Sequence, residues 1–333
     1  MLTLALRGAG SKKAWPQCRP SVPLFLEQKR SMPNIRMRTN AKINLFLRVL
    51  GPRSDGYHEI ETILHGINLY DEIDVGLTTS GRTEIQMNFA EGLHGELPDP
   101  EDNIITLVVD RLIERGALNE GVRVEIHKHI PIGAGLGGGS GNAAGALVAL
   151  NELWDIGLQP DDLNMVAGQV GTDVPYCIGG GTALATSRGD ELTPLPAPSD
   201  LNIVLGMSNQ PLLTRDVYAR WVAQETAPAV GSAPMTLALG GGDVTEIAPL
   251  LHNDLEPAIL ELRPELGAKK QALIEAGALG ALVTGSGPSI FGLARDEAHG
   301  REIAGAVDGV FDRTLVLQSQ SECIERLDLV ENA

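Results

Sequence analysis

The chain is poor in the residues that would indicate disulfide bonds, thiolate metal sites or a membrane span. Its 333 residues include only three cysteines, Cys18, Cys177 and Cys323, and their spacing matches no metal-binding motif. An odd number of widely spaced cysteines favours a reduced protein of the cytoplasm. No apolar run approaches the roughly 20 residues of a membrane-spanning helix, so we expect no membrane association.

Lysine and aromatic residues are also scarce. Tyrosine occurs four times, tryptophan three times and phenylalanine five times. Beyond residue 31 the lysines are Lys42, Lys128, Lys269 and Lys270. With a formal net charge of −17, such a chain is a poor partner for nucleic acids or anionic membranes. A lysine in a strand close to a loop motif is therefore a functional candidate.

The first 31 residues differ from the rest of the chain. Six of them are basic and one is acidic, while the apolar stretch at residues 2–6 is too short for the core of a signal peptide. We interpret residues 1–31 as a disordered extension, which is either a transit-like leader or the product of a start codon assigned too early. The second alternative is favoured because Met32 begins a well-patterned segment, whereas a true leader would imply a plastid location.

What the sequence has in abundance is glycine. Five of the seven residues from Gly133 to Gly139 are glycine, within a segment that runs from Pro131 to Ala144. An alternating strand at Val122–Ile126 precedes this segment, and a helical pattern follows it. A strand, a glycine loop and a helix start form a recurrent phosphate site, because glycine lets the backbone approach the anion and the helix N-terminus directs free N–H groups at it.

Several interpretations of this segment compete, the simplest being a glycine-rich surface turn. A Walker A loop needs a lysine after its second glycine, and Gly139 stands there, so this interpretation fails. The dinucleotide fingerprint Gly-x-Gly-x-x-Gly matches at Gly133, Gly135 and Gly138, but the acidic residue that should end a second strand follows a helical pattern instead. A third interpretation, a phosphate loop of small-metabolite kinases, depends on segments elsewhere in the chain.

The second half of the chain predicts further strands, helices and loops. Pro194–Pro198 is interpreted as a linker ahead of a buried strand at 201–206. Pro228–Gly242 is rich in alanine, glycine and proline and is predicted to be a loop. A helix at 268–276 leads to a strand at 280–284. This mixture of alternating strands and helices favours α+β layers over a uniform βαβ repeat.

Three further segments carry residues of chemical interest. The strand at 41–49 places Lys42 and Asn44 side by side on one face, because alternate residues of a strand share a face. The other two segments surround Asp173 and a second glycine turn. The motifs are Ala41-Lys42-Ile43-Asn44-Leu45 with the turn Asp55-Gly56-Tyr57-His58-Glu59, then Gly171-Thr172-Asp173-Val174-Pro175, and finally Gly285-Ser286-Gly287-Pro288-Ser289.

Together with the loop at 131–144, these segments resemble the motifs of the GHMP kinases, over residues 36–317. The resemblance implies an α+β fold with a ribosomal-protein-S5-like ATP-binding domain at 32–195 and a ferredoxin-like α/β-sandwich substrate domain at 196–333. It also implies phosphate transfer from ATP, with Mg²⁺, to an alcohol. The Lys-Asn strand and the Asp-Gly-Tyr-His turn are most similar to members that phosphorylate the 2-hydroxyl of a cytidine diphosphate conjugate of methylerythritol, in non-mevalonate isoprenoid biosynthesis.

The resemblance also implies a role for each motif residue. Asp173 would accept the proton of the substrate hydroxyl, and Lys42 would keep that carboxylate charged and favour the developing alkoxide. The ATP-binding residues would be Pro131, Ile132, Gly133, Ala134, Gly135, Leu136, Gly137, Gly138, Gly139, Ser140 and Gly141, with Asn103 and Lys128 lining the adenine pocket. Ser140 would also approach Mg²⁺. The substrate would contact Asn44, Tyr57, His58, Thr214, Gly285, Ser286 and Gly287, with Tyr57 stacking on the cytosine ring and His58 hydrogen-bonded to it.

One position departs from the family pattern. Many members have a second serine after the three glycines, where this chain has Gly141, so one hydroxyl is missing. The glycine still offers its backbone N–H, so we expect the protein to be active. We expect it to be a monomer or a homodimer. Two rival hypotheses are a kinase for another alcohol and an inactive homologue that only binds ligands. Retention of both Lys42 and Asp173 argues against the second.

Overall fold

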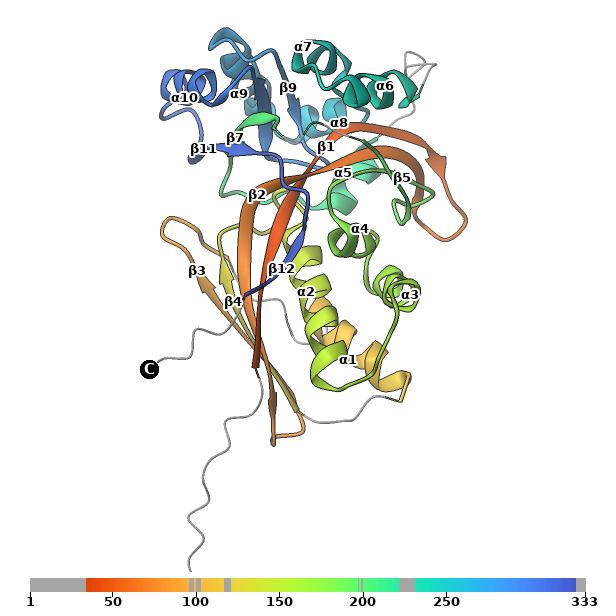
Figure 1. Ribbon diagram of the computed structural model, residues 1–333. Coiled ribbons are helices and arrows are strands. Elements are labelled where there is room, and N and C mark those ends of the chain that lie inside the picture. Colours follow the sequence, from red (N-terminus) through yellow and green to blue (C-terminus); the bar gives the residue numbers. More distant parts are fainter. Residues whose placement is uncertain are drawn as a thin grey trace, which may run out of the picture. The chain divides into compact units, whose positions relative to one another are not determined.

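Two long antiparallel strands, β1 (Asn34–Pro52) and β2 (His58–Thr78), form the centre of the larger sheet in the computed structural model (Figure 1). The structure describes residues 34–95, 99, 103–116, 121–196, 198, 200–221 and 231–327. The extension predicted at residues 1–31 lies outside the described residues. The strand predicted at 41–49 is confirmed, and it is the middle of β1.

The larger sheet has the strand order β12-β1-β2-β4-β3, with β5 and β6 continuing from β2 and β8 beside β1. Most neighbours are antiparallel, whereas β3 is parallel to β4 and β8 is parallel to β1. The bounds are β3 (Thr83–Phe89), β4 (Gly121–Lys128), β5 (Thr182–Thr186), β6 (Glu191–Pro194), β8 (His252–Asn253) and β12 (Ile324–Leu327). The alternation predicted at Val122–Ile126 is confirmed, because its apolar side chains are buried.

Helices from the first half of the chain cover one face of this sheet (Figure 1). They are α1 (Ile104–Glu114), α2 (Gly138–Leu153), α3 (Pro160–Val170) and α4 (Val174–Gly179). Helix α2 lies closest to β1, since a side chain at Gly145 would come within 2.7 Å of Thr39. Its small residues Ala143, Ala144 and Ala146 are fully buried, which fixes the helix that begins at the glycine loop.

The smaller sheet has the antiparallel order β11-β7-β10-β9, with helices α9 and α10 packed against it. Its strands are β7 (Asn202–Met207), β9 (Gly280–Val283), β10 (Ile290–Ala294) and β11 (Arg313–Gln318). The helices of this half are α5 (Thr214–Arg220), α6 (Ala233–Gly241), α7 (Val244–Ile247), α8 (Glu256–Leu262), α9 (Glu265–Glu275), α10 (Glu297–Ala306) and the 3₁₀ turn η1 (Ala248–Leu250). The predicted α+β class is confirmed.

The loop predicted at Pro228–Gly242 is wrong over its second part. Residues 228–230 lie outside the described residues, but helix α6 occupies Ala233–Gly241. Its Met235, Ala238 and Leu239 are buried at helical spacing. Alanine and leucine are strong helix formers, and their packing outweighs the glycines that suggested a loop. Gly242, with a φ of 78°, ends the helix in the left-handed conformation.

A shared hydrophobic core joins the two sheets. Ile43 and Leu45 of β1 belong to the same buried cluster as Leu205 of β7 and Phe291 of β10. Strand β12, close to the end of the chain, also pairs with β1. Because the two halves interlock in this way, the boundary predicted between residues 195 and 196 stays a prediction.

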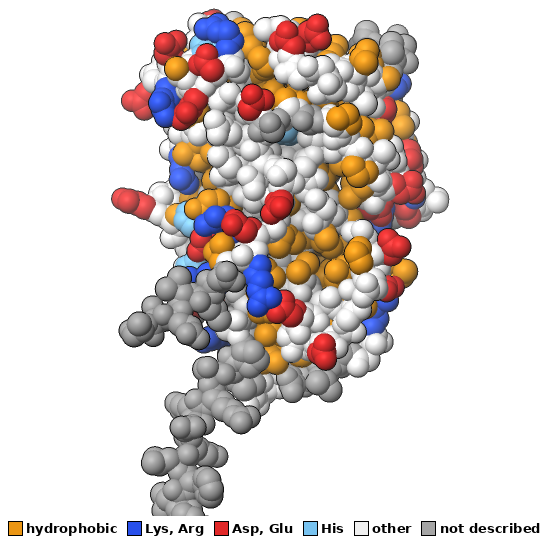
Figure 2. Space-filling view, viewed as in Figure 1, with side chains coloured by type: hydrophobic (Ala, Val, Ile, Leu, Met, Phe, Trp, Pro, Cys, Tyr) orange, Lys and Arg blue, Asp and Glu red, His pale blue; other side chains and the backbone are white. Residues whose placement is uncertain are grey.

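The surface carries mixed charges. On the face shown in Figure 2, basic side chains are interspersed with acidic ones. In the described part of the chain, Cys177 and Cys323 are buried free thiols. None of the helices described is both long enough and apolar enough to cross a membrane.

Candidate active site

A cavity of about 920 Å³ gathers most of the residues predicted to be functional. The larger sheet and the turn between β9 and β10 of the smaller sheet contribute to its walls, as do the glycine loop and the starts of α2, α4 and α5. The predicted residues in its lining are Lys42, Asn44, Tyr57, His58, Asn103, Lys128, Pro131–Ser140, Asp173, Thr214, Gly285 and Ser286. Gly141 and Gly287 were predicted to bind ligands and do not line it. The individual roles of all these residues stay predictions.

The glycine loop is a left-handed path into the start of helix α2. Gly133, Gly135 and Gly137 have φ values of 66°, 75° and 73°, a conformation that side chains disfavour. Gly137 is the N-cap of α2, and the first turn of the helix borders the cavity. The first N–H groups of a helix have no partner within it, so this end of the cavity is suited to an anion.

The second glycine turn packs directly on the first. A side chain at Gly135 would come within 2.4 Å of the Thr284 carbonyl oxygen, so the two loops touch backbone to backbone. Asn253, in β8, holds the second turn by donating from Nδ2 to the Gly285 carbonyl at 2.8 Å. The Thr214 and Ser286 hydroxyls are hydrogen-bonded at 2.9 Å, which links this turn to the start of α5.

Lys42 and Asp173 form an ion pair in the lining of the cavity, next to the glycine loop. The Lys42 ammonium lies 3.5 Å from the Asp173 carboxylate and also donates to Asn44 Oδ1 at 2.9 Å and to the Gly135 carbonyl at 3.2 Å. An ammonium group has three donors, so these contacts fix it in position. Only 6% of the Lys42 side chain is exposed, against 35% for Asp173. The cation is therefore held in the wall, and the carboxylate faces the open cavity.

Asp173 occupies the N-cap position of helix α4, yet its side chain makes no capping hydrogen bond. Pro175 in the first turn has no N–H to offer. The carboxylate consequently keeps oxygen lone pairs for a ligand in the cavity.

The two residues predicted to line the adenine pocket are held by structural contacts. Lys128 is 2% exposed, and its ammonium contacts the Asp71 carboxylate and donates to Asn142 Oδ1 at 3.1 Å. Asn103 is the N-cap of α1, and its side-chain oxygen accepts from the Ile105 N–H at 2.9 Å. Both border the cavity, but these polar atoms already have partners.

Aromatic side chains gather at the other end of the cavity. Tyr57 is 49% exposed there, while the His58 ring packs against Tyr218 with a centroid distance of 4.8 Å and edge-on against Trp221 at 5.7 Å. Tyr218 also lines the cavity, and burial raises the pKa of its hydroxyl, which stays neutral. Flat rings with polar edges are suited to a planar heterocycle.

Three residues of this region escaped the sequence analysis. Tyr218 lies four residues after Thr214, one helical turn away on the same face, and that spacing with the scarcity of tyrosine was a usable signal. Arg188 borders the cavity from the turn between β5 and β6. Asp71 is buried and contacts Lys128 and Asn142. Nothing in the local sequence of Arg188 or Asp71 indicates these places.

Gly141 faces away from the cavity. A side chain there would point towards β1, with its Cβ at 3.5 Å from Thr39 Cβ and 3.7 Å from the Asn40 carbonyl oxygen. These are ordinary contact distances, so the position has room for a small residue. A serine at this position would therefore carry its side chain on the face of α2 that packs against β1.

Comparison with known proteins agrees with this geometry. The sequence pattern of the GHMP kinases N terminal domain matches residues 103–181, and that of the GHMP kinases C terminal matches residues 235–313. A 4-diphosphocytidyl-2-C-methyl-D-erythritol kinase of Gloeobacter violaceus is 38% identical over 283 residues, which cover 84% of this chain and 91% of the relative. The enzyme of the same name from Pelotomaculum thermopropionicum is 38% identical over 84% of this chain and 96% of its own length.

Solved structures extend the comparison. A crystal structure of 4-(cytidine 5'-diphospho)-2C-methyl-D-erythritol kinase superposes with a TM-score of 0.69 and 29% identity, covering 85% of this chain and 98% of that one. A homoserine kinase from Cytophaga hutchinsonii has a TM-score of 0.70 at 23% identity, which shows the shared fold alone. The chain therefore belongs to the GHMP kinase family, in the branch of the 4-diphosphocytidyl-2-C-methyl-D-erythritol kinases.

Proposed function

We propose that this chain transfers the γ-phosphate of ATP to the 2-hydroxyl of 4-diphosphocytidyl-2-C-methyl-D-erythritol. The observation that carries the proposal is the pairing of Lys42 with Asp173 beside the glycine loop, in a cavity that Tyr57 and His58 also line. A donor bound at the loop and a nucleoside-linked acceptor bound at the aromatic end would meet at that carboxylate.

In the proposed reaction, Asp173 accepts the proton of the attacking hydroxyl while the oxygen forms its bond to the γ-phosphorus. The bond from that phosphorus to the bridging oxygen breaks, and ADP leaves. Lys42, held by Asn44 and Gly135, would balance negative charge where the alkoxide develops. The backbone N–H groups of the loop at 133–140 would bind the phosphates, since phosphoryl transfer depends mainly on positioning and charge neutralisation.

The chain's own donors fit a magnesium ion that is carried mainly by the nucleotide. Among the described residues, no three His, Cys, Asp or Glu side chains gather as a metal site, and Mg²⁺ commonly takes most of its ligands from phosphates and water. Ser140, at the start of α2, would supply a hydroxyl beside those phosphates. When bound, Mg²⁺ would neutralise part of their charge.

A kinase assay with alternative acceptors tests the proposal. Purified protein with ATP and Mg²⁺ should form ADP with 4-diphosphocytidyl-2-C-methyl-D-erythritol and show no comparable rate with galactose, homoserine or mevalonate. Phosphorus NMR of the product should show a new monoester on the 2-oxygen. Turnover of another alcohol alone would overturn the substrate assignment, and absence of turnover with every acceptor would favour a binding protein without catalytic activity.

The predicted cytoplasmic location and the predicted monomeric or dimeric state remain proposals. The buried free thiols of Cys177 and Cys323 support a reducing compartment, because neither is paired in the described structure. Sedimentation of the purified chain would measure its state of association.

A further inference from the structure

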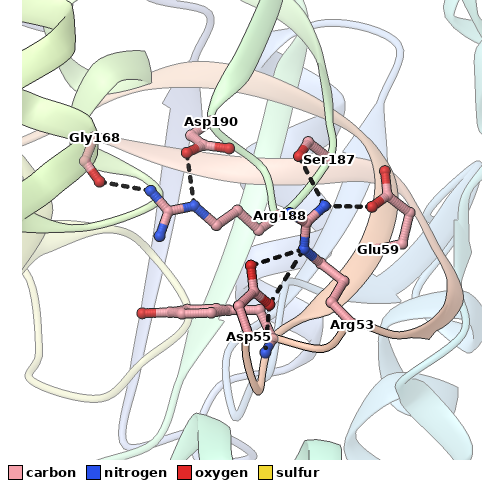
Figure 3. Close-up of polar contacts among 8 residues, drawn as sticks. Arg53, Asp55, Glu59, Gly168, Ser187, Arg188 and Asp190 are labelled. Atoms are coloured by element: carbon pink, nitrogen blue, oxygen red, sulfur yellow. Dashed lines mark hydrogen bonds and ion pairs between the residues drawn. The ribbon is translucent and has the colours of Figure 1, made fainter.

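Arg188 stands between the aromatic end of the cavity and the helix that leads to Asp173. It belongs to the turn that joins β5 to β6. Its guanidinium donates from Nε to Asp190 Oδ2 and from Nη2 to the Gly168 carbonyl, both at 2.7 Å (Figure 3). About a quarter of the side chain is exposed (27%). Two short charge-assisted bonds in different directions leave the planar group little freedom.

The fixed guanidinium lies over the ring of Tyr57. The distance from the Arg188 Cζ to the ring centroid is 5.2 Å, within the range of cation–π attraction. Tyr57 sits in a turn and is 49% exposed, so few contacts restrain its ring. Because the cation occupies one face, a base that stacks on Tyr57 takes the other face.

The turn that carries Arg188 is itself held in a strained conformation. Ser187 has a φ of 63°, which a residue with a side chain rarely adopts. Its carbonyl accepts the Ile60 N–H at 2.7 Å, and its hydroxyl accepts from Arg53 Nη1 at 3.0 Å (Figure 3). Strain of this kind persists where surrounding contacts over-determine the backbone.

Those contacts come from the same hairpin that carries Tyr57. Arg53, at its start, also pairs with Asp55 and Glu59, and Asp55 accepts the Tyr57 N–H at 3.1 Å (Figure 3). The hairpin therefore donates hydrogen bonds to Ser187 of the β5–β6 turn, and Arg188 of that turn contacts Tyr57 of the hairpin.

The remaining anchor of Arg188 leads to the reacting carboxylate. Gly168 lies in the last turn of helix α3, and the chain runs from the end of that helix through Gly171 and Thr172 to Asp173. Arg188 thus bridges the aromatic hairpin and the segment that carries Asp173.

We infer that Arg188 is a positioning residue for the acceptor substrate: its guanidinium, anchored on Asp190 and the Gly168 carbonyl, holds the Tyr57 ring ready to stack on the pyrimidine base. The inference rests on the proposed function, because it takes the base of the acceptor as the ligand of Tyr57. It assigns no direct contact between Arg188 and the substrate.

Titration with cytidine diphosphate and steady-state kinetics test the inference. In Arg188→Leu the Kd for cytidine diphosphate and the KM for the acceptor should rise about three- to thirtyfold, the range expected for loss of a cation–π support. The KM for ATP should not change. Arg188→Lys, which keeps a cation but loses the forked anchor, should lie between wild type and Arg188→Leu.

A double-mutant cycle separates this role from a direct one. If Arg188 acts through the tyrosine ring, Arg188→Leu should have no further effect on the Kd in a Tyr57→Leu background. Arg326→Leu is the matched control, since it removes a surface arginine paired with Glu152, and its Kd should equal that of wild type. Circular dichroism verifies that each variant is folded.

The outcomes distinguish the two proposals. If the wild-type protein does not bind cytidine diphosphate, the proposed acceptor is wrong and the inference falls with it. If the wild type binds and Arg188→Leu binds equally well, the inference alone is overturned. Additive effects of Arg188→Leu and Tyr57→Leu would also overturn it, because they would mean that the guanidinium contacts the ligand itself.

Discussion

Two buried lysines at the same cavity have opposite surroundings. Lys42 faces Asp173, whose side chain is 35% exposed, whereas Lys128 faces Asp71, which is fully buried. Asp71 also accepts the backbone N–H groups of His129 and Ile130, at 2.7 and 2.9 Å. The same pair of residue types thus occurs once with an open carboxylate and once with a closed one.

Both lysines are buried, so the exposure of the carboxylate is what distinguishes a pair that can act on a ligand from a pair that only stabilises the fold. A carboxylate that reaches the cavity can exchange a proton with a ligand, as Asp173 is proposed to do. The Asp71 carboxylate accepts hydrogen bonds from Lys128, Asn142 and two backbone N–H groups, and it thereby links the end of β4 to helix α2. Lys128, although predicted to line the adenine pocket, belongs to this second kind of site.

Replacing the open carboxylate should have the largest effect on activity. In Asp173→Asn we expect kcat to fall by about 10²- to 10⁴-fold, the usual contribution of a general base. ATP affinity should stay near the wild-type value, and the melting temperature should fall only slightly, because Lys42 loses its charged partner but keeps Asn44 Oδ1 and the Gly135 carbonyl as acceptors. Stopped assays with isothermal titration of ATP measure both quantities. Turnover close to wild type would remove the assignment of Asp173 as the base.

Breaking the closed pair should mainly affect stability. Lys128→Met leaves the Asp71 charge buried without its cation, so the free energy of unfolding should fall by about 3–5 kcal/mol. Lys42→Met is the matched variant, and its loss should be smaller because Asp173 can be solvated from the cavity. Urea denaturation of both variants gives the comparison. Equal losses would mean that exposure of the carboxylate does not distinguish the two pairs.

His65 is a buried titratable residue whose hydrogen-bond partners are neutral, in contrast to the two lysines. Its ring nitrogens are hydrogen-bonded to Thr182 and Ser319 hydroxyls, at 2.7 and 2.9 Å, and burial lowers the pKa of His65 to about 4. The unfolded chain binds the proton near pH 6.5, so acidification from pH 6.5 to 4 should cost on the order of 3 kcal/mol of stability.

The matched variant for that pH dependence is His65→Gln, which keeps polar groups but does not titrate. Its free energy of unfolding should vary less between pH 6.5 and 4 than that of the wild type, when both are measured by denaturation at several pH values. Parallel curves for the two proteins would show that the histidine is not the source of the acid sensitivity.

The smallest effect is expected at Gly141, which lies in α2 between Ser140 and Asn142. Gly141→Ser restores the hydroxyl that many relatives have, on the side of the helix that faces Thr39. The KM for ATP should change less than about threefold, equivalent to under about 0.7 kcal/mol. A much larger decrease in KM would show that this hydroxyl reaches the nucleotide and that its absence weakens the phosphate end of the cavity.

The sequence pointed to segments that line one cavity in the structure, although the roles of their residues stay predictions. Three glycines of the loop at 131–144 stand where the backbone has a positive φ. The absence of a lysine at residue 139 excluded a Walker A loop. Tyr57 and His58 stood out as rare residues in a polar turn. The loop predicted at Pro228–Gly242 failed because glycine content was weighed above the buried apolar spacing of α6.

Contacts between distant segments could not be predicted in this way. Asp71 and Lys128 are 57 positions apart in the sequence, and helices α1 to α4 lie between Tyr57 and Arg188 along the chain. No short-range periodicity records such pairs. They arise when β2 and β4 align in register and when the β5–β6 turn folds against the first hairpin.

By itself, the sequence determined which side chains are present for the proposed chemistry: glycines for a phosphate loop, a lysine and an aspartate for the proposed proton transfer, and aromatic side chains for the proposed stacking on a base. These are properties of residue types and of local backbone freedom. Only the tertiary structure decided which lysine faces an open carboxylate and which is enclosed. Exposure and hydrogen-bond partners depend on how the two sheets, helix α2 and the turns pack together, and they set what each charge can do.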